Sequence, residues 1–325
     1  MTAIREIRRW GRAHPAAITL IGSLIVTAAL VYGLWDKRDE FADSLSSASA
    51  TTLGLAIALQ VIWLIARSEA WHVCVKAAGS IAGRRRLYHA AAVGYLGNLF
   101  NPNFGLAVRI AALRRTAPSG SPPAKVLVTA ELPIVVVEVA LAAILSFTLI
   151  GPLNVPWWVP VLILGTAIVL IGGGTRFVRD RRLGFWQGLD VMRGLGSRNV
   201  VIALVMFATG AQVVRNMVVL HGLGVAISPW DAIALLIASA AIGLLPVGPT
   251  LGAATAVLIL GSNGVAVVAA AGALLTATGA AGALLFAAWA LTDRLRPSRH
   301  YPTDTGRAPP TEESGSNAED RVAAL

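Results

Sequence analysis

Apolar residues occupy most of this chain in stretches long enough to cross a lipid bilayer. Six of them, at residues 16–35, 50–67, 125–150, 157–175, 199–221 and 265–291, are separated by shorter polar or basic segments. About 20 apolar residues in a helix span the roughly 30 Å hydrocarbon core, and a helix satisfies its backbone hydrogen bonds within the segment. The pattern predicts an all-α polytopic membrane protein with six full transmembrane helices.

Two further apolar stretches, at residues 87–113 and 231–260, are interrupted near their centres by a Pro-x-x-Gly sequence. Proline removes a backbone donor and ends or kinks a helix, so neither stretch is expected to cross as one helix. Interrupted segments in corresponding positions of two halves are typical of a transporter's substrate site. The breaks lie at Pro102 and Gly105 in the first stretch and at Pro246, Pro249 and Gly252 in the second.

The distribution of Lys and Arg predicts on which side each interrupted stretch enters the membrane. Basic residues lie on both flanks of the stretch at 87–113, whereas the flanks of the other, residues 222–230 and 261–265, contain none. Positive charge favours the cytoplasmic side. We therefore expect two oppositely oriented re-entrant helical hairpins, one opening to the cytoplasm and one to the outside, with both chain termini cytoplasmic.

The predicted order of elements is a unit of two spans, a hairpin and a span, repeated with inverted orientation. Membrane repeat 1 covers 16–150 and membrane repeat 2 covers 157–291, between a basic cytoplasmic N-terminus at 1–15 and a disordered cytoplasmic tail at 297–325. The sequences PNFGLAVRIAAL and PTLGAATAVLIL align without gaps at an offset of 147 residues. Arg67 and Arg215 end comparable apolar runs at an offset of 148.

Composition agrees with an integral protein of the cell (inner or plasma) membrane, since 56% of the residues are hydrophobic and 14% are charged. The net charge of +10 resides in loops between apolar runs, so we do not expect nucleic-acid binding. A single cysteine, Cys74, and five histidines without metal-site spacing predict no metal and no cofactor. The sequence contains no nucleotide-binding motif of the GxxxxGK[ST] type.

Charged residues at membrane depth are the candidates for function, because each costs about 2.5 to 3.5 kcal/mol to insert and needs a partner or a wet cavity. Glu131 and Glu138 are seven residues apart, which is two helical turns, so they share one helix face. They predict a cation or proton site, or the counter-charge of an arginine. For Glu131 the alternative is a side chain that extends to the cytoplasmic surface.

Three arginines are candidate contacts for an anionic substrate. Arg109 follows the first Pro-x-x-Gly break by four residues, where free backbone amides and a guanidinium suit a lipid phosphate; the alternative is a salt bridge to Glu131 or Glu138. Arg67 and Arg215 are expected near opposite membrane faces, where a substrate would meet one at each end. The alternative is ordinary extension of each side chain to the surface.

The stretches GYLGNLFNPNFGLAVRIAALRR and LLPVGPTLGAATAVL resemble two signatures of the lysylphosphatidylglycerol synthase transmembrane-region family. The resemblance covers roughly residues 18–291 and implies a flippase-like fold, with the family pattern matched at Pro102, Gly105, Arg109, Pro246, Pro249 and Gly252. The chain departs from the family at Leu106 and Thr255, where members often carry acidic residues. Either Glu131 and Glu138 supply the acidic contacts here, or this chain has lost them.

The combined prediction is a lipid translocase that moves a phosphate-bearing phospholipid, glycolipid or polyprenyl-phosphate carrier between leaflets. We expect no enzymatic activity, because no aminoacyltransferase domain follows the last span. The alternatives are a membrane-embedded transferase with Glu131 or Glu138 as general base, and a non-transporting partner of a cell-envelope enzyme. Small residues at 269–282 permit close helix contact within the fold or in a homodimer.

Overall fold

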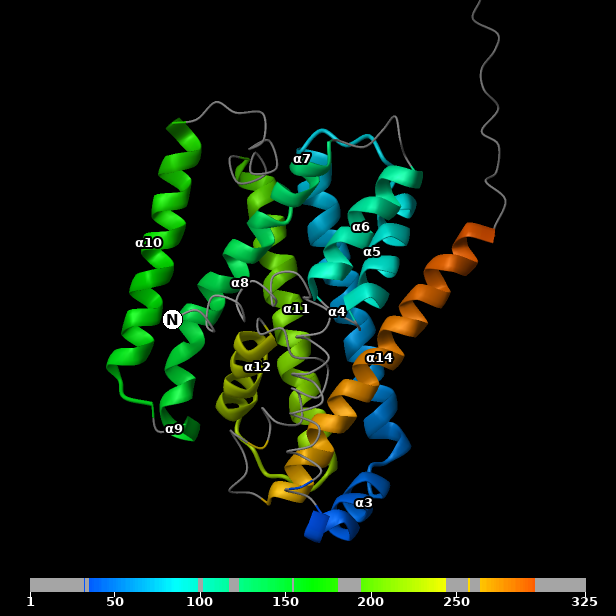
Figure 1. Ribbon diagram of the computed structural model, residues 1–325, viewed down its shortest axis with the longest axis vertical. Helices are drawn as coiled ribbons and strands as arrows, with labels where there is room; N and C mark the ends of the chain where they lie inside the picture. The colour runs from blue at the N-terminus through cyan, green and yellow to red at the C-terminus, as the bar shows by residue number, and fades with distance from the viewer. Residues whose placement is uncertain are drawn as a thin grey trace, which may run out of the picture.

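The computed structural model describes residues 32, 35–98, 102–116, 123–153, 155–180, 194–243, 257 and 264–295, and every regular element in them is a helix (Figure 1). Four helical segments among them are long and apolar enough to cross a membrane. For the described residues, this confirms the prediction of an all-helical fold with helices that could cross a membrane. These segments are Ala50–Ala77, Ala124–Leu149, Gly196–Gly222 and Val265–Ala290.

Two long helices, α4 (Ala50–Ala77) and α11 (Leu195–Gly222), pack side by side at the centre of the molecule. They run antiparallel, since Gly222 at the end of α11 lies against Thr52 in the first turn of α4. The apolar run predicted to end at residue 67 continues ten residues further as helix. The reason is tertiary: Trp71, Cys74 and Val75 in that extension are fully buried in the hydrophobic core.

The last helix, α14 (Val265–Leu295), crosses the molecule obliquely and packs on α4 and on the short helix α3 (Arg38–Ser46), which follows the 3₁₀ turn η1 (Trp35–Lys37). Small residues allow the close approach to α4. A Cβ added at Gly282 would lie 2.6 Å from Cγ of Gln60, closer than real contacts permit. Glycine at this position therefore lets α14 pack over a polar side chain of α4.

The apolar segment predicted at 125–150 forms a series of consecutive helices. It comprises α7 (Ala124–Thr129), α8 (Leu132–Leu145), η2 (Ser146–Leu149) and α9 (Ile150–Leu153), after which α10 (Trp158–Asp180) returns along the molecule. The interruption after α7 places Glu131 in a turn. Pro133 is the second residue of α8, a position where the missing N–H has no intrahelical partner to lose.

The first interrupted stretch forms a pair of antiparallel helices, α5 (Arg84–Asn98) and α6 (Pro102–Thr116). The start of α5 and the end of α6 lie at the same end of the molecule (Figure 1). The helices approach closely because glycines face each other: a Cβ added at Gly105 would lie 2.6 Å from the carbonyl oxygen of Gly94 and would clash with the side chain of Asn98. The conformation thus requires the glycine of the Pro-x-x-Gly sequence.

The first arm of the second interrupted stretch is α12 (Pro229–Gly243), which lies in the half of the molecule opposite to α5 and α6 (Figure 1). The predicted break at Pro246, Pro249 and Gly252 lies outside the described residues, as do the segments 1–15, 16–31 and 297–325.

The helices of the two halves follow each other at a constant spacing in the sequence. The starts of α4 and α11 are 145 residues apart, and so are their ends. The same offset of 145 residues separates the start of α5 from the start of α12.

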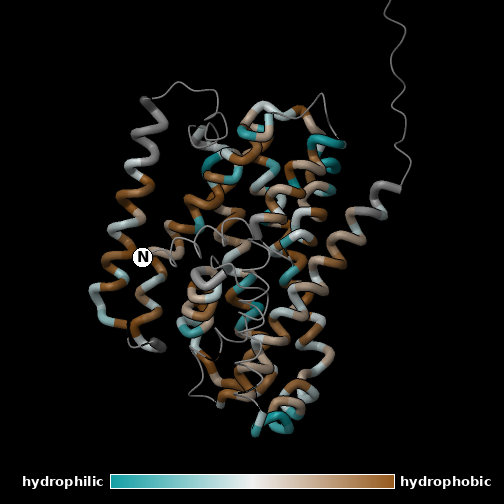
Figure 2. The backbone as a smooth tube through the Cα atoms, viewed as in Figure 1, coloured by the Kyte–Doolittle hydropathy of each residue, from teal (hydrophilic) through white to brown (hydrophobic). Residues whose placement is uncertain are grey.

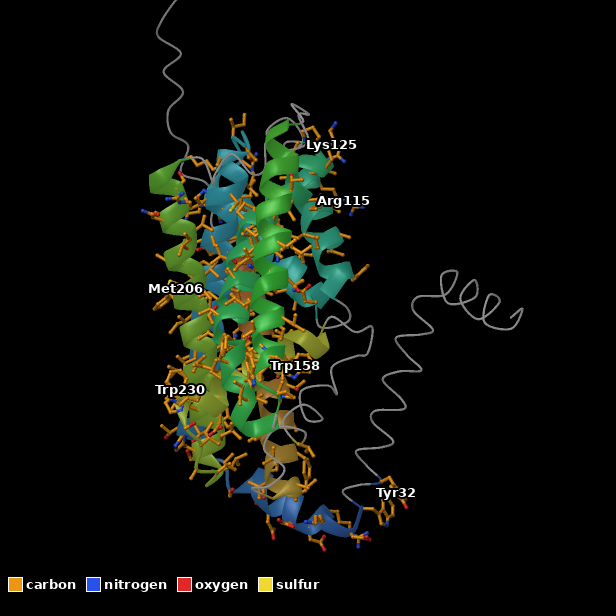
Figure 3. The ribbon with its side chains drawn as sticks, turned by 90° about the vertical axis from the view of Figure 1, so that its left-hand side faces the viewer. Tyr32, Arg115, Lys125, Trp158, Met206 and Trp230 are labelled. Atoms are coloured by element: carbon orange, nitrogen blue, oxygen red, sulfur yellow. The ribbon has the colours of Figure 1, made fainter. Side chains whose placement is uncertain are left out.

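Polar residues gather at the two ends of the molecule, and apolar residues predominate between them (Figure 2). Figure 3 places Arg115 and Lys125 near one end and Trp158, Trp230 and Tyr32 in the other half. Both tryptophans are more than half exposed, as side chains at a membrane interface often are. We call the end that carries Arg115 and Lys125 the basic end.

Candidate functional site

Four of the five charged residues predicted for the site meet in one cluster inside the helix bundle. Arg67 of α4 lies between two carboxylates, with Nη2 3.0 Å from Oε1 of Glu131 and Nη1 2.9 Å from Oε1 of Glu138. Nη1 of Arg109 on α6 donates to the other oxygen of Glu131 at 3.1 Å. We call these four residues the ion-pair cluster. Its formal charge sums to zero.

The positions of the two glutamates follow from the helix geometry around them. Glu131 occupies the turn before α8, and Glu138 follows two helical turns later, so both carboxylates face α4. The prediction that they share one face is confirmed. The Glu131 side chain is 12% exposed and that of Glu138 is 39% exposed. Glu131 is thus the more enclosed of the two, and it is held inward by both arginines.

Arg109 is the most deeply enclosed charge of the cluster, with its side chain 5% exposed. Its guanidinium carbon lies 5.0 Å from the ring centre of Trp71 and 5.3 Å from that of Tyr95, distances at which the aromatic faces stabilise a cation. Gly94 makes room for it, since a Cβ there would lie 3.1 Å from Nε. The structure contains the Arg109–Glu131 salt bridge that was one of the two sequence-based alternatives.

A second polar cluster lies beside the first, between α4, α11 and α14. Nη1 of Arg215 donates to Oε1 of Gln212 at 3.1 Å, and Nε2 of Gln212 donates to Oε1 of Gln60 at 2.9 Å. Nη2 of Arg215 donates to Oγ1 of Thr278 at 2.8 Å and to the carbonyl of Leu275. We call Gln60, Gln212, Arg215 and Thr278 the glutamine–arginine cluster.

Arg215 differs from the other two arginines because no carboxylate among the described residues pairs with it. The residue is 6% exposed and points inward toward α14, so its side chain does not extend to the surface. A guanidinium inside an apolar bundle is costly unless an anion or a wet cavity accompanies it. The glutamine–arginine cluster therefore carries an unbalanced positive charge.

The two clusters are stacked along α4. Gln60 and Arg67 are seven residues apart, which places them on one helix face and separates them by about 10 Å along the axis. Arg67 is ten residues from the end of α4, and Arg215 is seven residues from the end of the antiparallel α11. The two arginines consequently lie at different depths. We call the ion-pair cluster and the glutamine–arginine cluster together the polar column.

Several buried N–H groups in this column make no hydrogen bond with the described residues. They include Nε of Arg109 in the ion-pair cluster, Nε1 of the adjacent Trp71, and Nε of Arg215 in the glutamine–arginine cluster. Buried donors are rarely left without an acceptor. An acceptor-rich group such as a phosphate is the kind of ligand that satisfies donors of this type.

A third polar group joins α4 to α5 nearer the basic end. Nε and Nη2 of Arg84 each lie 2.6 Å from Oε1 of Glu69, and the hydroxyl of Tyr88 donates to the same oxygen. Nδ1 of His72 lies 3.5 Å from Oε2 of Glu69. This group is partly exposed and links the first turns of α5 to α4.

Sequence reasoning missed the uncharged members of the polar column. It counted only charged residues, whereas Gln60, Gln212 and Thr278 contact the charged Arg215 or each other. A usable signal was present, because a glutamine inside an apolar run of 18 or more residues needs a polar partner. No group of three or more His, Cys, Asp or Glu side chains in the described part of the chain is placed to hold a metal ion.

The break residues of the first hairpin lie on the same helix as Arg109 of the ion-pair cluster. Pro102 begins α6, Gly105 permits the contact with α5, and Arg109 lies one turn further along α6. The corresponding residues Pro246, Pro249 and Gly252 are not among those described.

Comparison of the chain with protein-family models, with curated proteins and with solved structures finds no match.

Proposed function

We propose that this chain is a lipid translocase of the cell membrane, which moves a phosphate-bearing amphiphile between the two leaflets. The motif resemblance to the lysylphosphatidylglycerol synthase transmembrane-region family suggests this class. The head group would pass through the polar column while the acyl or prenyl chains remain in the surrounding lipid. In this proposal the basic end and both chain termini face the cytoplasm.

The observation that carries the proposal is a buried guanidinium with an unused N–H donor at each of two depths. Arg109 supplies one and Arg215 supplies the other, in clusters about 10 Å apart along α4. A salt bridge that only stabilised the fold would need neither an unused donor nor an unbalanced charge. A phosphate that moves between the clusters would find a cation at both levels.

The ion-pair cluster suits reversible binding because its arginines share carboxylates. Glu131 uses one oxygen for Arg67 and the other for Arg109, so displacement of this single side chain frees the guanidinium of Arg109 and leaves Arg67 paired with Glu138 alone. Phosphate oxygens would take the place of the carboxylate oxygens with the same charge-assisted geometry. Glu131 and Glu138 would then act as competing anions that release the substrate.

Two features support an inverted repeat with opposed re-entrant hairpins. The pair α5 and α6 begins and ends at the basic end, and α12 lies in the other half of the molecule (Figure 1). The shared offset of 145 residues between helix ends is close to the 147 and 148 found in the sequence. Transporters built this way alternate access to a site between their repeats.

The transferase alternative receives less support from the site. A general base needs a carboxylate oxygen that is free to accept a proton from the substrate, and both oxygens of Glu131 already accept from arginines. Glu138 is also paired with Arg67. The geometry favours the counter-charge role for both residues.

The test is leaflet-to-leaflet movement of fluorescent phospholipid and polyprenyl-phosphate analogues in proteoliposomes. The variant Arg109→Gln/Glu131→Gln removes one cation and one anion, so Arg67 and Glu138 remain as a balanced pair. We expect this variant to lose most of the wild-type movement. Arg114→Gln, an exposed change five residues along the same helix, is the matched control and should keep it.

Absence of movement for every analogue with folded wild-type protein would contradict the proposal. Movement that is equal in the wild type and in the double variant would show instead that lipid crosses elsewhere. Folding of each variant is checked by a single symmetric peak in size-exclusion chromatography.

A further inference from the structure

Two adjoining hollows lie at the basic end, where α5, α6 and α14 come together. The first has a volume of about 380 Å³ and is lined by Arg85, Arg86, His89, Arg115 and Thr116. The second has a volume of about 410 Å³ and is lined by Arg84, Arg85, Tyr88, His89, Trp289 and Ala290. Arg85 and His89 line both, so the two hollows lie next to each other. Neither includes a residue of the polar column.

The first hollow has a strongly positive lining. Three arginines line it, and none of the described carboxylates does. Glu69, the acidic side chain that contacts Arg84 of the second hollow, already accepts hydrogen bonds from Arg84 and Tyr88. Neither Arg86 nor Arg115 makes an ion pair with any residue that the structure describes. A polyanionic group such as a phosphate is the complement of this arrangement.

The second hollow adds an apolar surface beside the charge. Trp289 is 52% exposed, lies at the end of the apolar helical segment Val265–Ala290, and packs edge-on against Tyr88 with ring centres 5.6 Å apart. Tryptophan at the end of a spanning helix marks the level at which head groups meet acyl chains. This apolar surface would not stabilise a water-soluble anion, but it can pack against the glycerol region and the upper acyl chain of a lipid.

We propose that the two hollows form a binding site for an anionic phospholipid. Arg85, Arg86 and Arg115 bind the phosphate in the first hollow, and the glycerol region and the start of one acyl chain lie against Trp289 in the second. Basic pockets between spanning helices are suited to anionic head groups. The site is separate from the polar column, and lipid can bind there whether or not the protein moves lipid across the membrane.

The experiment measures binding of phosphatidylglycerol and of phosphatidylcholine to the purified full-length protein by native mass spectrometry. We expect preferential binding of phosphatidylglycerol, weakened about tenfold or more in Arg86→Gln/Arg115→Gln. The matched control Lys76→Gln/Arg114→Gln removes two exposed charges at the same end that line neither hollow, and it should bind as the wild type does.

A second arm separates a lipid from a soluble anion. Trp289→Ala should weaken phosphatidylglycerol binding severalfold and leave the weak binding of inorganic phosphate unchanged. Inorganic phosphate that competes fully with phosphatidylglycerol, with no effect of Trp289→Ala, would overturn the proposal in favour of a soluble ligand. Equal loss of binding in the Lys76→Gln/Arg114→Gln control would overturn it in favour of general surface charge.

Discussion

Arg109 and Glu131 form a buried ion pair, with Nη1 of the arginine 3.1 Å from Oε2 of the glutamate. Removal of either partner alone leaves an uncompensated charge inside the bundle, and such changes cost about 3 to 5 kcal/mol. We therefore expect Arg109→Gln and Glu131→Gln each to lower the unfolding free energy by an amount of that order. The double variant should be more stable than either single variant.

A double-mutant cycle of thermal unfolding in detergent measures this coupling. Effects of the two single substitutions that add in the double variant would show that the pair contributes no interaction energy. Such additivity would contradict the arrangement of the ion-pair cluster described above.

The close contact of α5 with α6 predicts that Gly105 does not tolerate a larger residue. In Gly105→Ala the new Cβ would lie 2.6 Å from the carbonyl oxygen of Gly94, so the two helices would have to separate. We expect a clear loss of thermal stability. Gly165→Ala in α10 is the control, because a Cβ there meets nothing within 4 Å and alanine favours a helix. Equal stability of the two variants would contradict the hairpin packing.

The proposed re-entrant hairpin predicts that both of its ends are accessible from the same side of the membrane. In a Cys74→Ala background, Ile81→Cys before α5 and Arg115→Cys at the end of α6 should react with a membrane-impermeable maleimide only from the cytoplasmic side. Trp230→Cys at the start of α12 should react only from the outside. Reaction of Ile81→Cys and Arg115→Cys from opposite sides would mean that the stretch crosses the membrane.

The single cysteine offers a direct check on the length of α4. Cys74 is fully buried seven residues beyond Arg67, within the part of α4 that the sequence analysis did not assign to a span. We expect its thiol to stay unreactive toward maleimide in folded protein and to react once the protein is denatured. Rapid labelling under native conditions would show that α4 does not pack as described beyond Arg67.

The apolar pattern predicted the general positions of the long helices well. It also located the break at Pro102 and the common face of Glu131 and Glu138, because these features depend on local chemistry and helix periodicity. The end of α4 was placed too early because the apolar run ends at Arg67, and the charged Glu69 follows two residues later. Their partners, Glu131 and Arg84, are distant in sequence, and the pairing that lets the helix continue cannot be read from a local pattern.

The contacts within the polar column also join residues that are distant in sequence, so a local pattern could not predict them. Arg215 was predicted to be a site residue, but its contacts with Gln212 and Thr278 arise from packing between α11 and α14. The interruption of the predicted span at Glu131 had a visible signal in Pro133, which follows it by two residues. Its consequence, a glutamate whose two oxygens reach two different helices, follows only from the tertiary arrangement.

The most direct test of the translocase proposal is lipid movement by Arg215→Gln in proteoliposomes that contain a phosphate-bearing lipid analogue. Since no described carboxylate pairs with Arg215, its neutralisation leaves no unpaired charge, and the variant should fold. Arg198→Gln, near the other end of the same helix, is the matched control. The proposal predicts movement by the wild type and by Arg198→Gln and a loss of at least tenfold in Arg215→Gln. Undiminished movement by folded Arg215→Gln would contradict it.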